Sequence, residues 1–146
     1  MLSLCILLLC FVPLAWQQKI LVQHPSPNEK VIANSVVPVE YHVQRLDHFQ
    51  PSSSISVVLQ WQHLGSDQTL HANVHHGLTA RAHRALEDLY FYHWRTPHCH
   101  FFLRYPPTQF NFSMVFTPAN TTEASIVDIP LDFSSVVANT CHGQHH

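Results

Sequence analysis

Glycine and charged side chains are both scarce in this chain of 146 residues. It contains 3 glycines, and only 11% of its residues are Asp, Glu, Lys or Arg. The phosphate-binding turns of P-loop and dinucleotide-binding domains depend on closely spaced glycines, and the sequence contains neither a G-x-G-x-x-G nor a G-K-S/T motif. The composition therefore excludes the nucleotide-binding folds that are built around such a turn.

The chain also lacks a strong charge of either sign. Its 7 basic and 9 acidic residues give a formal net charge of −2. Binding to nucleic acid needs an excess of Lys and Arg against the phosphates, so we expect no nucleic-acid partner. Because 46% of the residues are hydrophobic, the composition is not that of a disordered protein, and the length fits one domain.

A single long hydrophobic run lies at the N-terminus, where residues 2–16 are apolar except for Ser3. A helix needs about 20 residues to cross a bilayer, so this run is short for a membrane span and has the length of a signal-peptide core. We predict that residues 1–18 are a signal peptide cleaved between positions 15 and 18, with an uncleaved signal anchor as the alternative. The mature chain would then be secreted and extracellular, with no transmembrane span.

If the chain is secreted, two cysteines can form a disulfide and two asparagines can carry N-glycans. Cys99 and Cys141 are the cysteines that remain in the mature chain, and a thiol pair in an oxidising compartment usually forms a disulfide. We predict this bond, with two buried free thiols as the alternative. Asn111 and Asn120 each begin an N-x-S/T sequon, so we also predict N-glycosylation at both positions.

Hydrophobic and polar residues alternate through most of the mature chain, and this period of two is typical of half-buried strands. The clearest strands are 37–43, 55–62, 110–117 and 127–133, and shorter candidates are 19–24, 90–94 and 101–105. Asn111 falls on the outward, polar face of its strand. Pro38 and Pro130 suggest edge strands, because proline cannot donate to a strand ladder.

One segment shows helical spacing instead. In residues 79–89, apolar side chains recur at positions 82, 85, 86 and 89, and Thr79 can cap the start. Alternating strands indicate antiparallel sheets with one face in the core. We therefore predict an all-β fold, a single immunoglobulin-like antiparallel β-sandwich of about seven strands at 19–135 with one short inserted helix. A histidine-rich tail would follow at 136–146.

The order of these segments is also informative. A Pro-Asn turn follows the first strand, a short apolar strand comes next, and a Trp-x-x-Pro segment follows later. The residues concerned are His24-Pro25, Pro27-Asn28, 37–41 and Trp94-Arg95-Thr96-Pro97. In these positions the chain resembles the immunoglobulin-like N-terminal domain of fungal secreted Ser/Thr-rich proteins associated with cell-wall synthesis, over most of residues 19–133. The resemblance implies a sandwich fold and a role at the cell surface or wall.

No set of residues in the sequence identifies a reaction. The H-E-x-x-H and C-x-x-C motifs are absent. Glu87 and Asp88 would be adjacent on the predicted helix and would not face each other, while Asp128 and Asp132 fall on the solvent face of a predicted strand. We therefore place both acidic pairs on solvated faces and predict that the protein is not an enzyme and has no catalytic residues.

Histidine is present in large excess, with 14 residues. If Cys99 bonds Cys141, their α-carbons lie within about 4.4–6.8 Å, which brings the neighbouring histidines into one region. Imidazoles bind Cu²⁺ and Zn²⁺, so a metal site there is the alternative to a solvated tail. Its ligands would be His98 and His100, on one face of a strand, and His142, His145 and His146 in the tail. Three more histidines lie in residues 71–77, which predict an exposed loop.

Together these features favour a small secreted glycoprotein that acts as a non-catalytic binding or structural module at the cell surface or cell wall. Its expected partner is a cell-wall polysaccharide or an extracellular protein, and no cofactor is expected. Two other functions remain open: a secreted histidine-rich protein that binds Cu or Zn, and a small extracellular enzyme.

Overall fold

The computed structural model describes residues 19–44, 54–76, 80–84, 87–118 and 125–136. Within these ranges the chain forms nine strands in two sheets and one short helix. This arrangement confirms the prediction of an all-β protein with a small helix. The predicted signal peptide at 1–18 and residues 137–146 of the predicted tail lie outside the described residues.

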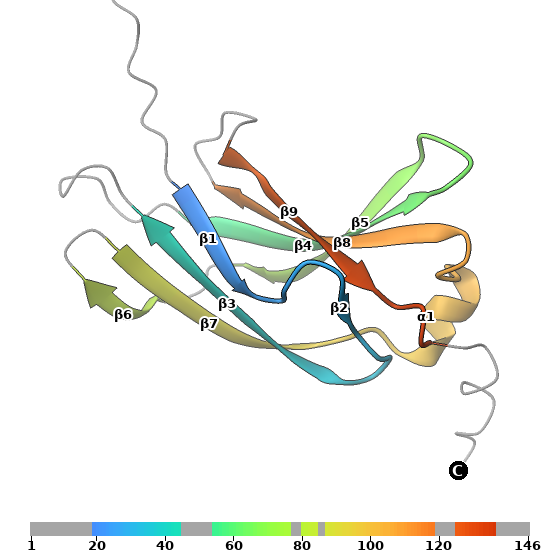
Figure 1. Ribbon diagram of the computed structural model, residues 1–146, viewed down its shortest axis with the longest axis horizontal. Helices are drawn as coiled ribbons and strands as arrows, with labels where there is room; N and C mark the ends of the chain where they lie inside the picture. The colour runs from blue at the N-terminus through green and yellow to red at the C-terminus, as the bar shows by residue number, and fades with distance from the viewer. Residues whose placement is uncertain (1–18, 45–53, 77–79, 85–86, 119–124, 137–146) are drawn as a thin grey trace, which may run out of the picture.

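The two sheets form two layers (Figure 1). The first has the order β1-β3-β7-β6, with all pairs antiparallel. Its strands are β1 (Lys19–His24), β3 (Val36–Gln44), β6 (Ala80–Arg84) and β7 (Glu87–Arg95). The second sheet has the order β2-β9-β8-β4-β5, and only its β2–β9 pair is parallel. Its strands are β2 (Glu29–Lys30), β4 (Ile55–His63), β5 (Thr69–His76), β8 (Phe110–Pro118) and β9 (Val127–Asp132).

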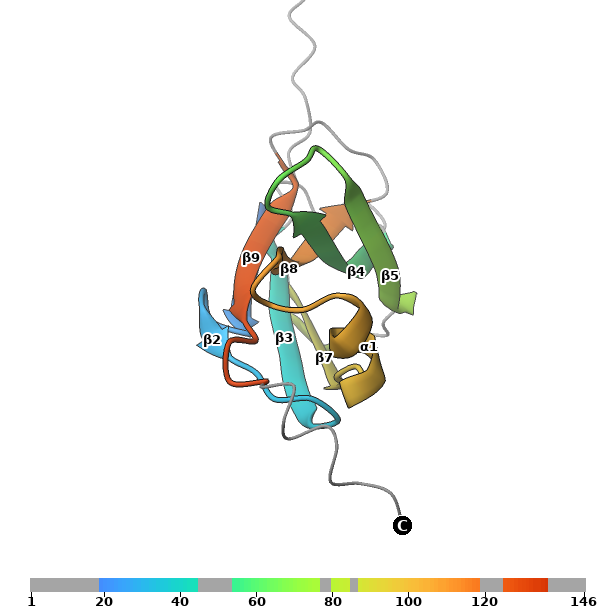
Figure 2. The same cartoon turned by 90° about the vertical axis from the view of Figure 1, so that its right-hand side faces the viewer.

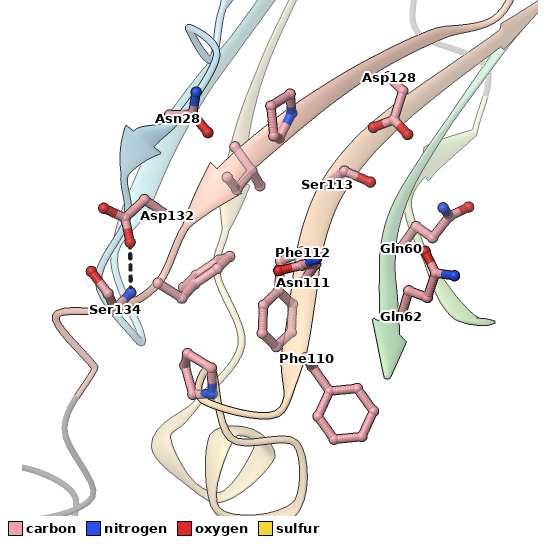
Figure 3. A pocket seen from close by; sticks show the side chains of 14 residues that line it. Asn28, Gln60, Gln62, Phe110, Asn111, Phe112, Ser113, Asp128, Asp132 and Ser134 are labelled. Carbon is pink, nitrogen blue, oxygen red and sulfur yellow. Dashed lines mark hydrogen bonds between the residues drawn. The ribbon is translucent and has the colours of Figure 1, made fainter. Parts of the chain in front are cut away.

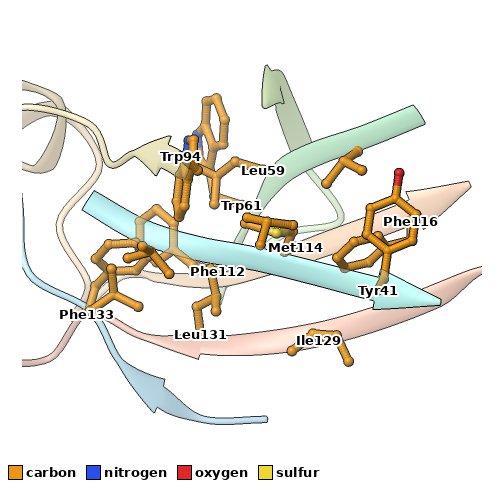
Figure 4. Packing of buried hydrophobic residues seen from close by; sticks show 14 of the residues in the cluster. Tyr41, Leu59, Trp61, Trp94, Phe112, Met114, Phe116, Ile129, Leu131 and Phe133 are labelled. Atoms are coloured by element: carbon orange, nitrogen blue, oxygen red, sulfur yellow. The ribbon is translucent and has the colours of Figure 1, made fainter. Parts of the chain in front are cut away.

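The core lies between the sheets and follows from the alternation in the sequence. Inward side chains of β3, β4 and β8 are almost completely buried, among them Val39, Val57 and Met114 at 0% exposure. Tyr41 of β3 contacts Phe116 of β8 across the layers, with ring centroids 5.2 Å apart (Figure 4). Fully burying one such apolar side chain contributes about 1.5–3 kcal/mol, so these alternating strands stabilise the fold through one shared core.

The predicted strands 19–24, 37–43, 55–62, 90–94, 110–117 and 127–133 are all confirmed, except that Phe133 lies just beyond the end of its strand. The prediction of a helix at 79–89 is wrong. This segment contributes β6 and the start of β7, which pair antiparallel with Arg84 opposite Glu87. A helix of about 11 residues is marginal on its own, so pairing with β3 along the whole of β7 decides the structure.

The small helix lies elsewhere. It is α1 (Cys99–Arg104), where the sequence predicted a short strand at 101–105. Apolar side chains at successive and i,i+4 positions explain the difference: Phe102 is buried, and the Phe101 and Tyr105 rings lie 5.1 Å apart. Figure 2 views the molecule from the end where α1 lies. Among the described residues, no helix has the length and apolar character needed to span a membrane.

Two other expectations about strands need correction. Residues 71–76 belong to β5 and are not a loop. Pro38 and Pro130 do not mark edge strands, because β3 lies between β1 and β7, and β9 lies between β2 and β8. Each proline instead lies just outside the stretch that pairs with a short neighbouring strand. The β1–β3 pairing stops at His24 and Glu40, and the β2–β9 pairing starts at Glu29 and Leu131.

Candidate functional site

The outer face of the second sheet carries a polar groove of about 650 Å³ (Figure 3). It runs over β4, β8 and β9, the three strands that are adjacent in this sheet. Its polar lining consists of Asn28, Gln60, Gln62, Asn111, Ser113, Asp128, Asp132 and Ser134. These side chains face outward because their neighbours along each strand, such as Trp61 and Phe112, point into the core.

Strand register places the amides and hydroxyls of the groove beside one another. Gln62 of β4 lies opposite Asn111 of β8, and Gln60 lies opposite Ser113. Ser113 in turn lies opposite Pro130 of β9. Directly opposite residues have Cβ atoms about 4.5–5.5 Å apart, so a small ligand over β8 can contact all three strands at once.

One end of the groove is shaped by Asp132 at the end of β9. The backbone N–H of Ser134 donates a hydrogen bond of 2.8 Å to Oδ1 of Asp132. Hydrogen bonds from the hydroxyl and then from the backbone N–H of Ser134 lower the pKa of Asp132 below its ordinary value. The carboxylate is therefore ionised and directed toward its own turn.

The turn before β2 forms the rim next to β9. Asn28 adopts a positive φ of 59°, a conformation that asparagine tolerates better than most residues. Its backbone N–H donates to the carbonyl of Pro130 at 2.7 Å, and Ser26 N–H donates to Oε2 of Glu29 at 2.7 Å. These bonds hold the Asn28 side chain at the edge of the groove.

Aromatic packing supports the floor of the groove from inside. The Phe112 and Phe133 ring centroids are 5.1 Å apart, and Phe102 of α1 lies 4.8 Å from Phe133. Phe101 of α1 packs edge-on against Trp61 of β4 at 5.0 Å. The helix thus braces the part of β4 and β8 that carries Gln62 and Asn111.

The predicted modification and disulfide residues fall partly within the described ranges. Asn111 is exposed on β8, as its outward position predicts, whereas Asn120 and Cys141 lie outside the described residues. Cys99 is half-buried at the first position of α1. Its pairing with Cys141 and both glycosylations stay predictions.

Of the histidines predicted as metal ligands, His98 and His100 lie within the described ranges, and they are not arranged on a strand as expected. His98 precedes α1 and His100 lies within it, both exposed, so they do not share one face of a strand. Side chains two positions apart on a helix do not face each other. In the described ranges, no group of three or more His, Cys, Asp or Glu residues is placed to hold a metal. His142, His145 and His146 lie outside these ranges.

The acidic pairs also differ from expectation at one position. Asp88 is completely buried on β7, because β7 turns it toward the core beside Val43 of β3. Asp128 is exposed and Asp132 is half-buried, both on the outer face of β9. The prediction of a solvated face is therefore wrong for Asp88 and confirmed for Asp128 and Asp132.

Three residues of the groove, Gln60, Gln62 and Asn28, were not expected from the sequence to be site residues. The alternation in 55–62 already placed both glutamines on an outward face. The order of the strands was the missing information, since it brings β4, β8 and β9 together from distant parts of the chain.

Comparison with known proteins adds little to this geometry. No protein-family model matches the chain, and no curated protein matches it significantly. Among solved structures, it is similar to a DUF4466 family protein from Parabacteroides merdae, with 12% sequence identity and a TM-score of 0.32. The match covers 81% of this chain and 43% of that chain, so this chain spans less than half of that structure.

Proposed function

We propose that the chain is a secreted, non-catalytic module that binds polysaccharide at a cell surface or cell wall through the groove over β4, β8 and β9. The observation that carries the proposal is the row of amide and hydroxyl groups formed by Gln60, Gln62, Asn111 and Ser113 in a groove of about 650 Å³. This volume lies within the range of about 300–1,000 Å³ typical of small-ligand sites. The resemblance to wall-associated fungal domains supports a polysaccharide as the ligand.

The chemistry of the lining suits a carbohydrate. Each amide offers two donors and an acceptor, a serine hydroxyl can donate or accept, and an ionised carboxylate accepts only. Sugar hydroxyls also donate and accept, so they can pair with every polar group of the groove. Pro107 and Pro130 add apolar surface for the C–H face of a pyranose ring.

The two carboxylates of the groove favour binding over hydrolysis. Asp128 and Asp132 are four residues apart on one strand, which separates their α-carbons by about 13 Å. Two carboxyl groups on such a strand approach the glycosidase spacing of about 5–9.5 Å only if their side chains lean toward each other. Asp132 is also turned toward Ser134, and its lowered pKa makes it a poor proton donor. This geometry supports a non-catalytic role.

We also propose that the fold is an immunoglobulin-like sandwich. The order β1-β3-β7-β6 agrees with the A-B-E-D sheet of such domains, and β9-β8-β4 agrees with G-F-C. The first strand is divided between the sheets as β1 and β2. A buried Trp61 on β4 takes the place of the tryptophan on strand C.

The test is calorimetric titration of the chain made in a bacterial periplasm, where disulfides form and no N-glycan is added to the sequons. Hexasaccharides of β-1,3-glucan, chitin and mannan serve as probes. We expect one of them to bind at a single site and Gln60→Ala or Gln62→Ala to weaken it about fivefold, as loss of one or two hydrogen bonds predicts.

Gln23→Ala is the matched control, because Gln23 is an exposed glutamine on β1 of the other sheet. It should leave the affinity unchanged. Absence of binding by all three hexasaccharides, or equal losses in Gln23→Ala and the groove variants, would refute the proposal.

A further inference from the structure

We infer that an N-glycan on Asn111 occupies the groove and closes it to external polysaccharide, so that the proposed function belongs to copies of the chain without this glycan. The effect on external ligands depends on the proposed function, whereas the placement of the glycan depends only on the geometry of β8. Asn111 is exposed and belongs to the sequon Asn111-Phe112-Ser113. Its side chain is part of the groove lining itself (Figure 3).

A glycan on Asn111 would start between the outward side chains of two neighbouring strands. β8 lies between β9 and β4 in the second sheet, so a sugar on Asn111 has groove side chains on both sides. Gln62 lies directly opposite on β4. Ser113, the next outward residue along β8, is about 6.6 Å away. The first sugar is therefore attached inside the groove and not at its rim.

Formation of the glycan needs only the ordinary reaction of a secreted sequon. Nδ2 of Asn111 attacks the anomeric carbon of an oligosaccharide linked to a lipid diphosphate. The bond from that carbon to the phosphate oxygen breaks, the amide loses one proton, and the lipid diphosphate leaves. Asn111 keeps one N–H and its carbonyl oxygen, so the linkage remains compatible with a polar surrounding.

The attached N-acetylglucosamine would use the same partners as an external sugar. Its hydroxyl and acetamido groups lie within reach of the Gln60 and Gln62 amides and the Ser113 hydroxyl, which the proposed function assigns to polysaccharide. Two ligands cannot fill these hydrogen-bonding positions at once. Glycosylation of Asn111 therefore converts an open binding face into one occupied by the chain's own sugar.

The first experiment uses the full chain secreted from a eukaryotic host. Mass spectrometry of its glycopeptides measures occupancy at Asn111. An amidase that releases N-glycans is then applied to the folded protein. We expect release from Asn111 to be about fivefold faster in the double variant Gln60→Ala/Gln62→Ala than in Gln23→Ala, because the groove hydrogen bonds no longer hold the first sugar.

The second experiment measures hexasaccharide binding by the Asn120→Gln protein in two forms, so that the groove residues stay unchanged. The form secreted from the eukaryotic host has Asn111 as its remaining sequon of the two, and the form made in the bacterial periplasm carries no N-glycan. The periplasmic form should bind about as tightly as the unglycosylated chain, and the secreted form should bind at least tenfold more weakly, since its Asn111 is glycosylated.

Either of two results overturns the inference: Asn111 carries no glycan in the secreted protein, or its glycan is released at the same rate from the groove variant and from Gln23→Ala. Failure of the proposed function has a different signature. If no hexasaccharide binds the unglycosylated periplasmic protein but the release rates still differ, the glycan occupies the groove and the polysaccharide proposal is wrong.

Discussion

Tyr41 places a polar hydroxyl group in the hydrophobic core. Its side chain is completely buried, and among the described residues the hydroxyl has no hydrogen-bond partner. The ring stacks on Tyr90 with centroids 5.0 Å apart and planes at 6°. Burial, and then the neighbouring Tyr90, raise the pKa of Tyr41 well above its ordinary value, so the phenol is neutral.

We expect Tyr41→Phe to leave the free energy of unfolding unchanged or to raise it by about 1 kcal/mol, because it removes an unsatisfied buried group and keeps the ring. Tyr41→Ala should lower the same quantity by about 3–5 kcal/mol, because it leaves a cavity between the sheets. Urea unfolding measures both. A loss of stability in Tyr41→Phe would show that the hydroxyl has a hydrogen-bond partner.

Thr96 is a buried polar residue of the opposite kind. It is 2% exposed, and its hydroxyl donates to the carbonyl of Ile32 at 2.8 Å. The same oxygen accepts the backbone N–H of Ser35 at 2.8 Å. Thr96 directly follows β7, so these hydrogen bonds hold the connection between β2 and β3 against the end of β7. They also offset the cost of burying the Thr96 hydroxyl.

At the scale of elements, α1 depends on packing more than on its own sequence. It has six residues, and no side chain caps its first turn. A helix this short is not stable alone. Phe102 anchors it between Phe112 and Phe133, with ring centroids at 5.7 and 4.8 Å.

Phe102→Ala should therefore lower the free energy of unfolding by about 3–5 kcal/mol. Leu103→Ala is the matched control on the same helix, since Leu103 is 44% exposed and its truncation should cost no more than about 0.5 kcal/mol. Thermal or urea unfolding separates the two variants. Similar losses in both would mean that α1 is held by its own helical propensity and not by the aromatic cluster.

The sequence predicted the elements whose packing follows one strict period. Residues 37–43 alternate without interruption and form β3, and residues 110–117 alternate except at Val115 and form β8. Residues 79–89 were misread because their alanines and leucines fit a helix locally, while the stabilising contacts come from β3, far away along the chain. Short segments such as 101–105 carry too few positions for a period to decide.

The sequence predicted which residues of the groove face outward, but not which strands lie side by side. Alternation identified which face of each strand is polar, and Asn111 was placed correctly on that basis. No local pattern states which strands become neighbours. The groove therefore emerged only with the sheet order that joins β9, β8 and β4.

At the scale of the whole molecule, the short length of β1 leaves part of β3 without a partner strand on one side. β1 ends with His24 opposite Glu40, so no residue of β1 pairs with the stretch of β3 at Pro38. An open strand border is a template on which a second molecule can add a strand. Proline offers no N–H to such a strand, and Pro38 lies where the border opens.

Protection from self-association should therefore depend on position 38. Pro38→Val supplies the missing donor in a strongly strand-forming residue, and we expect faster aggregation of the folded protein on warming, measured by light scattering, at an unchanged urea midpoint. Pro38→Lys also lacks the proline but adds a charge that discourages strand addition, so it should remain monodisperse. A Pro38→Val protein that stays as monodisperse as the parent would contradict this role. Pro38, which lies just beyond the end of the β1–β3 pairing, would thus also determine the concentration up to which the folded protein stays monomeric.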